Sequence, residues 1–65
     1  MTMDRKTLIA RLRQLQVVDK NAFAIYTELS ELVKDEDKRK LFSGIAKDEK
    51  RHIALGEEML SLLER

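Results

Sequence analysis

Hydrophobic residues recur at alternating spacings of three and four along two long stretches of the chain, and a short polar segment separates the stretches. This spacing places side chains on one side of an α-helix, so the pattern predicts two helices. The polar segment has no hydrophobic residue between Val33 and Leu41, and Asp35 is suited to cap the start of a second helix. We therefore expect helices over about residues 2–34 and 36–64, with a turn at about 34–36. The whole chain, residues 1–65, is expected to be a single all-α domain, an antiparallel two-helix hairpin.

Three ionisable side chains interrupt the apolar faces that these helices would turn toward each other. The first face is predicted to consist of Leu8, Leu12, Leu15, Asp19, Ala22, Tyr26, Leu29 and Val33. The second is predicted to consist of Phe42, Ile45, Glu49, His52, Gly56, Met59 and Leu63. Charged groups at such positions are costly unless they are paired or bind a metal. In a hairpin that turns near Asp35, residues at equal height have numbers that sum to about 70, so Asp19 should lie opposite Glu49 and His52.

Asp19, Glu49 and His52 are candidate metal ligands. Glu49 and His52 are three residues apart, so they lie on one helix face and can point at one ion, and Asp19 adds a carboxylate from the facing helix. Carboxylate and imidazole donors suit Fe, Mn or Zn. One chain supplies only three donors, which is an incomplete set for one ion and cannot hold two.

A homodimer would complete this ligand set. A chain of 65 residues without cysteine needs a metal, a partner chain or both for comfortable stability. Twofold symmetry is the default for homo-oligomers, and two hairpins would form a four-helix bundle with four carboxylates and two histidines. This is the ligand set of the di-iron carboxylate bundles, in which the two Glu49 side chains would bridge the metals and Asp19 and His52 would each cap one.

Two motifs carry a family resemblance. Asp19 is followed by alanine at the third position and by Tyr26 at the seventh, and the second helix reads FSGIAKDEKRH. Over nearly its whole length the chain resembles the rubrerythrin and ferritin-like superfamily, and in its short form it is similar to the encapsulated ferritins. The resemblance implies two iron ions per dimer, a homodimer or higher homo-oligomer, and O₂ or peroxide as substrate in Fe(II) oxidation or peroxide reduction. The family usually has Glu where this chain has Asp19, which is one methylene shorter.

Three neighbouring residues each have a structural and a functional interpretation. The hydroxyl of Tyr26 would lean toward the metal layer as a hydrogen-bond donor or electron relay, or Tyr26 is a core aromatic residue. Asp48 would accept a hydrogen bond from His52 of the second copy, or it is ordinary helix surface. Gly56 would admit a small oxidant, or it allows close packing of the helices.

Composition narrows the remaining function classes. The 13 basic and 12 acidic residues nearly cancel, so nucleic acid is not an expected partner. Four basic residues near the N-terminus form either a solvated face or a docking patch for an anionic partner: Arg5, Lys6, Arg11 and Arg13. The sequence contains no transmembrane span and no secretory signal, so we expect a cytoplasmic protein, with a protein compartment as the alternative location. The alternative function is a non-catalytic oligomerisation module, in which the polar layer only fixes the register of the helices.

Overall fold

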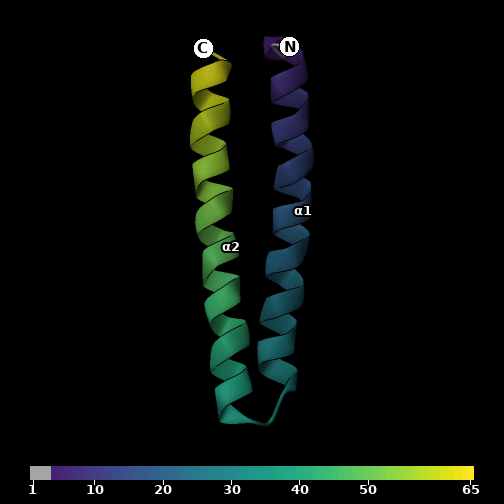
Figure 1. Ribbon diagram of the computed structural model, residues 1–65, viewed down its shortest axis with the longest axis vertical. Coiled ribbons are helices and arrows are strands. Elements are labelled where there is room, and N and C mark those ends of the chain that lie inside the picture. The colour runs from purple at the N-terminus through teal and green to yellow at the C-terminus, as the bar shows by residue number, and fades with distance from the viewer. Residues whose placement is uncertain (1–3) are drawn as a thin grey trace.

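The computed structural model describes residues 4–65, and they form two helices joined by a tight turn (Figure 1). Helix α1 spans Arg5–Leu32 and helix α2 spans Glu36–Leu63, with 28 residues in each. The helices lie side by side and antiparallel, so both termini are at one end and the turn is at the other (Figure 1). The longest dimension is 46 Å, as expected for helices of this length. The prediction of an all-α two-helix hairpin is confirmed for the described residues.

Each helix begins at an aspartate that caps its first backbone N–H groups. The Asp4 carboxylate accepts a hydrogen bond from the Thr7 N–H at 2.7 Å. The Asp35 Oδ1 atom accepts from the N–H groups of Asp37 at 2.9 Å and Lys38 at 3.2 Å. Arg5 is the first residue of α1 in the described part of the chain, and the predicted start, residue 2, lies outside the described residues.

The cap at Asp4 gives the structure one acid-sensitive contact. The hydrogen bonds that Thr7 donates lower the pKa of the Asp4 carboxyl below its ordinary value of 3.8. A lowered pKa in the folded state means that the folded state prefers the ionised carboxylate. The stability contributed by this cap is therefore present above pH 3.8 and is lost as the pH falls through the lower folded-state pKa.

An arginine from each helix binds the carbonyl end of the other helix. At the turn, Val33 has left the helical conformation, with ψ at 141°, and its carbonyl accepts a hydrogen bond from Arg39 Nη2 at 3.0 Å. The connection is therefore residues 33–35, one position earlier than predicted. At the opposite end, Arg5 donates to the carbonyl oxygens of Leu63 and of Arg65, the latter at 2.7 Å. These bonds satisfy carbonyl groups that have no partner within their own helix.

The basic N-terminal residues are partly used inside the hairpin. Arg5 binds the end of α2 as described, and Arg13 forms an ion pair with Glu64. Two of the four residues considered for an anionic docking patch are thus engaged in holding the two ends of the chain together.

The residues between the helices differ from the predicted set at seven positions. Those that are buried or half-buried at alternating spacings of three and four are Ile9, Leu12, Gln16, Asp19, Phe23, Tyr26 and Ser30 in α1, Val33 directly after it, and Phe42, Ala46, Glu49, Ile53, Gly56, Leu60 and Leu63 in α2. Leu15 was predicted among them but is 52% exposed, and Gln16, at 8%, takes its place. Met59 and His52 are also exposed rather than between the helices. The apolar stripe of each helix is wide enough for two rows of side chains, and the hairpin covers only one row.

The second row forms what we call the outer apolar face. It consists of Leu15, Val18, Ile25, Leu32, Leu41, Leu55, Met59 and Leu62, with exposed fractions between 45% and 68%. Most of these residues directly precede a residue that lies between the helices, as Val18 precedes Asp19 and Leu55 precedes Gly56. Each is therefore rotated by about 100° about its helix axis, in the same sense, from the residue that follows it. Because the helices are antiparallel, this rotation brings both rows to the same side of the hairpin.

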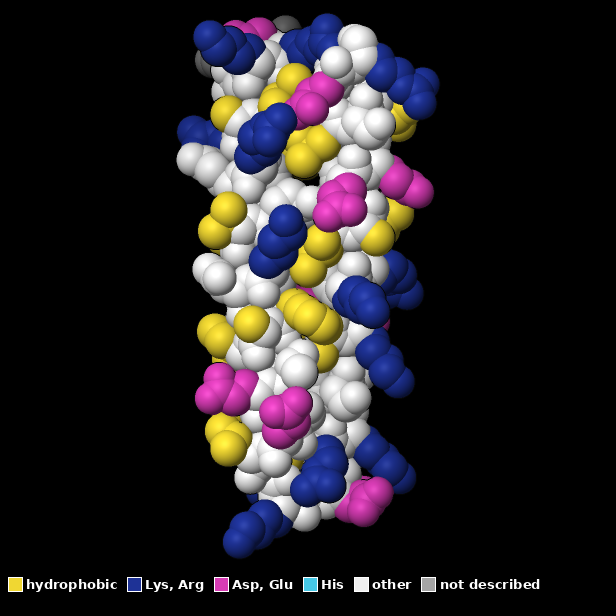
Figure 2. Space-filling view, turned by 180° about the vertical axis from the view of Figure 1, so that it is seen from behind, with side chains coloured by type: hydrophobic (Ala, Val, Ile, Leu, Met, Phe, Trp, Pro, Cys, Tyr) yellow, Lys and Arg dark blue, Asp and Glu magenta, His cyan; other side chains and the backbone are white. Residues whose placement is uncertain are grey.

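The two broad faces differ in character. On the face shown in Figure 2, acidic and basic side chains stand over both helices, and hydrophobic side chains follow the line between them.

Among the described residues Ala46 is the only buried hydrophobic one, so the hairpin alone has almost no core. Within residues 4–65, neither helix combines the length and the hydropathy that crossing a bilayer requires.

We expect Asp35→Ala to lower the free energy of unfolding by about 1 kcal/mol, because two N–H groups of α2 lose their cap. Asp35→Asn should retain most of the stability, since asparagine also caps helices. Urea unfolding followed by circular dichroism at one fixed protein concentration measures both. Equal stability of Asp35→Ala and the wild type would show that the cap contributes nothing.

Candidate metal centre

Asp19, Glu49 and His52 come together at mid-height of the hairpin, on the side where the two helices meet. Each offers one ligand atom, and these atoms all lie within 4.8 Å of one another. Asp19 comes from α1, while Glu49 and His52 come from adjacent turns of one face of α2. The structure therefore brings together the three side chains that the residue spacing placed in one layer.

The spacing of the cluster is close to that of ligands on a common ion. Two donors with metal–ligand bonds of about 2.1 Å are separated by at most about 4 Å. The separations here reach up to 4.8 Å, so a small side-chain rotation would bring all three onto one ion. Carboxylate and imidazole groups are donors that iron, manganese and zinc accept.

The Glu49 side chain gives the clearest indication that the cluster lacks a cation or a hydrogen-bond donor. Its Oε2 atom is buried and has no hydrogen-bond partner among the described residues. A buried carboxylate oxygen without a partner costs free energy that a cation or a donor would recover. The burial and donor types of this cluster therefore fit a divalent metal.

The cluster is closed on one side and open on the other. Asp19 and Glu49 are half-buried between the helices, whereas His52 is exposed. His52 lies seven residues before Met59, two turns away on the same helix face, so it belongs to the side of the outer apolar face. One chain thus offers three donors, and any further donor would have to approach from the uncovered side.

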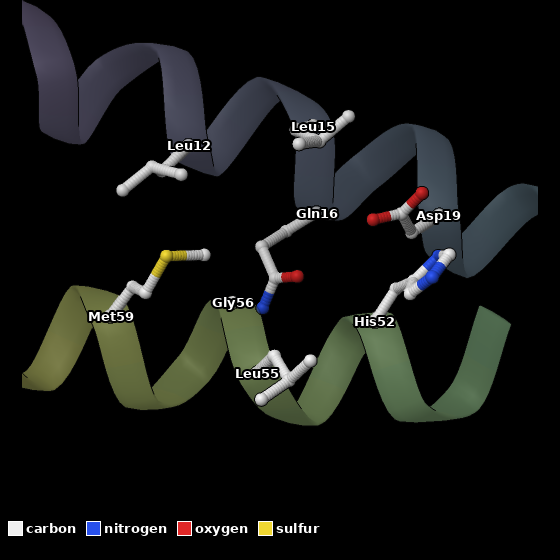
Figure 3. A pocket seen from close by; sticks show the side chains of 8 residues that line it. All are labelled: Leu12, Leu15, Gln16, Asp19, His52, Leu55, Gly56 and Met59. Atoms are coloured by element: carbon white, nitrogen blue, oxygen red, sulfur yellow. The ribbon is translucent and has the colours of Figure 1, made fainter. Parts of the chain in front are cut away.

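A groove of about 270 Å³ runs from this cluster along the hairpin (Figure 3). Its lining residues are Leu12, Leu15, Gln16, Asp19, His52, Leu55, Gly56 and Met59. Leu15 of α1 and Met59 of α2 line the same groove, which confirms that the two exposed rows share one side. The Gln16 side chain crosses the space between the helices toward Gly56, next to the pair of Asp19 and His52 (Figure 3).

Gln16 was not among the residues predicted to line the site. Its Nε2 atom donates a hydrogen bond to the carbonyl oxygen of Ile53 at 3.2 Å. Two signals in the sequence could have found it: Gln16 lies one turn before Asp19, and Gly56, a residue without a side chain, lies at the matching height of the second helix.

Gly56 leaves space that Gln16 fills. A Cβ atom at this position would lie 2.5 Å from Gln16 Oε1 and 2.9 Å from Gln16 Cδ, which is too close for any real contact. The Gln16 amide therefore fills the space directly over Gly56, and Gly56 also lines the groove beside the cluster, so access of an oxidant stays a prediction.

Tyr26 and Asp48 have structural roles within the single chain. The Tyr26 ring packs on Phe42 with ring centroids 6.3 Å apart and planes at 28°. Asp48 is exposed and pairs with Arg51 at 3.3 Å. The further roles considered for them, a tyrosine hydroxyl near the metal layer and a bond from Asp48 to a second copy, stay predictions.

No protein-family model, curated protein or solved structure matches this chain.

We expect Glu49→Met to stabilise the metal-free protein by about 1 kcal/mol, because it removes a buried oxygen without a partner and fills the same space with apolar atoms. The midpoint of urea unfolding in the presence of a chelator measures this. The control is Glu57→Met, which replaces an exposed glutamate of the same helix and should change little. A lower midpoint for Glu49→Met would mean that the Glu49 carboxylate is already satisfied without a metal.

Proposed function

We propose that this chain is a half-length, ferritin-like di-iron carboxylate protein that holds its metal site across a homodimer interface. The convergence of Asp19, Glu49 and His52 around a buried carboxylate oxygen without a partner carries the proposal. The activity is Fe(II) oxidation, as in iron handling, or reduction of O₂ or peroxide.

The outer apolar face supports a second copy as the covering partner. It presents eight large hydrophobic side chains on one side of a hairpin whose interior is nearly without a core. A row of apolar residues at alternating spacings of three and four is what helices of a four-helix bundle bury against one another. Because His52 and the groove lie on this side, a copy packed there would bring its own three donors toward the same place.

The residues fit iron as a resident cofactor. Asp19, Glu49 and His52 from each copy would hold the metal, and Mn or Zn suits the same donors. When bound, a pair of Fe(II) ions would supply the electrons for reduction of O₂ or peroxide. The apolar side chains of Leu15, Leu55 and Met59 would limit water around the site once a second copy covers them.

We expect the wild-type protein to bind two Fe(II) ions per dimer and to oxidise them in an O₂-dependent reaction. Glu49→Ala and His52→Ala should each abolish most of the binding and the oxidation, because each removes a donor from both copies. Elemental analysis combined with native mass, and absorption of the Fe(III) product, are the measurements. Glu57→Ala, which removes an exposed carboxylate of the same helix, is the matched control and should behave like the wild type.

A metal-free dimer that does not respond to added Fe(II) would refute the di-iron function. That result would support the alternative, a non-catalytic oligomerisation module in which the polar layer fixes the register of the helices.

Two adjacent valines test which face the second copy covers. Val18, on the outer apolar face, is 60% exposed, and Val17, turned away from that face, is 61% exposed. We expect Val18→Asp to shift the dimer to monomer and to weaken Fe(II) binding, because it places a charge in the buried interface. Val17→Asp should leave both unchanged. Sedimentation velocity gives the mass, and equal behaviour of the two variants would place the interface elsewhere.

A further inference from the structure

Gln16 is the most buried polar side chain described, and it lies where a helical bundle normally has a leucine. It is 8% exposed and is flanked at inner positions by Leu12 and Asp19. A buried amide is tolerated when its polar atoms are bonded, and such a residue in an apolar row is known to fix the register of paired helices. The hydrogen bond that Gln16 donates to the Ile53 carbonyl therefore indicates a role beyond filling space.

The bond between Gln16 and Ile53 connects the two turns that carry the metal-binding side chains. Gln16 is one turn from Asp19 in α1, and Ile53 directly follows His52 in α2. We propose that Gln16 is a positioning residue for this cluster: seated on Gly56 and bonded to the Ile53 carbonyl, it holds Asp19 at the height of His52. The inference rests on the proposed function, since it concerns the same three side chains.

The height of Asp19 needs such an anchor. The connection begins 14 residues after Asp19, or about 21 Å along the helix axis, so on its own it sets the register at this layer only to within about one helical turn. Apolar contacts are non-directional and allow two helices to slide, and a slide of one turn is about 5.4 Å. A displacement of that size would carry Asp19 out of the 4.8 Å range within which the three ligand atoms lie. A hydrogen bond tolerates only a few tenths of an ångström, so Gln16 can fix what the leucines cannot.

Gly56 leaves the space that the Gln16 side chain occupies. A Cβ at Gly56 would meet the Oε1 and Cδ atoms of Gln16 at 2.5 and 2.9 Å, so any side chain there would push the amide away. Gly44, in the same helix, meets nothing within 4 Å. The close approach is thus specific to position 56, where a side chain would have to displace the amide of Gln16, whereas Gly44 offers a matched control.

The test is a double-mutant cycle read out with Co(II), a spectroscopic probe for carboxylate and imidazole sites. The variants are Gly56→Ala, Gln16→Ala, their combination, and the control Gly44→Ala. We expect Gly56→Ala and Gln16→Ala each to bind Co(II) about tenfold more weakly and with an altered visible spectrum, as is typical when a residue that orients a ligand is lost. The double variant should bind no worse than Gln16→Ala alone, because Gly56→Ala acts only through Gln16. Gly44→Ala should match the wild type.

Stability provides a contrasting readout. Alanine favours helix more than glycine does, so Gly44→Ala should raise the unfolding midpoint without changing Co(II) affinity. Gln16→Met retains the length of the side chain, removes the amide and should fold, yet it should bind Co(II) as weakly as Gln16→Ala. The proposal is overturned if Gly56→Ala or Gln16→Met binds Co(II) with wild-type affinity. It is also overturned if Gly56→Ala weakens Co(II) binding by the same factor in the wild-type protein and in the Gln16→Ala variant.

A metal-free measurement separates this inference from the proposed function. In the protein without metal, nuclear Overhauser contacts between Asp19 and the His52 ring should be present in the wild type and Gly44→Ala and lost in Gly56→Ala. If the wild type binds neither Fe(II) nor Co(II), the di-iron function fails, and these contacts still decide the role of Gln16. Contacts that persist in Gly56→Ala refute it.

Discussion

The structure depends on one constraint: each helix has apolar side chains for two rows of contacts, and a hairpin can cover only one. The covered rows hold the two helices together but leave Ala46 as the only buried hydrophobic residue described. The uncovered rows form the outer apolar face, which lies on the open side of the candidate metal-ligand cluster. The surface that a partner would have to cover to complete a core therefore lies beside the donors of the candidate site.

Most of the fold could be predicted from the sequence because its determinants are local. Alternating spacings of three and four define the helices, and Asp35, near the start of the polar segment, caps α2. The cluster could be predicted as well, since a short turn in an antiparallel hairpin fixes which residues share a height. That rule needed only the position of the connection between the helices. The predicted connection was one residue too late, and this error shifted the expected partners of Asp19 by less than one turn of helix.

The rotation of each helix about its axis could not be predicted in the same way. A wide apolar stripe is compatible with Leu15 or Gln16 facing the other helix, and hydrophobicity alone favours Leu15. The structure turns Gln16 inward because Gly56 offers space for it and the Ile53 carbonyl accepts its amide. This choice depends on a contact between residues 40 positions apart, 16 and 56, and it emerges only when the two helices are compared at matching height.

The start of α1 and the end of α2 lie at the end of the hairpin opposite the turn, and the long axis of the hairpin measures 46 Å (Figure 1). This geometry determines how two copies could be joined covalently. If the copies lie parallel to each other, a few residues would link the last residue of one to the first of the next. If they point in opposite directions, the link must span the length of the bundle, which takes at least about 13 extended residues. The shortest linker that yields an intact four-helix single chain would thus reveal the direction of the symmetry axis.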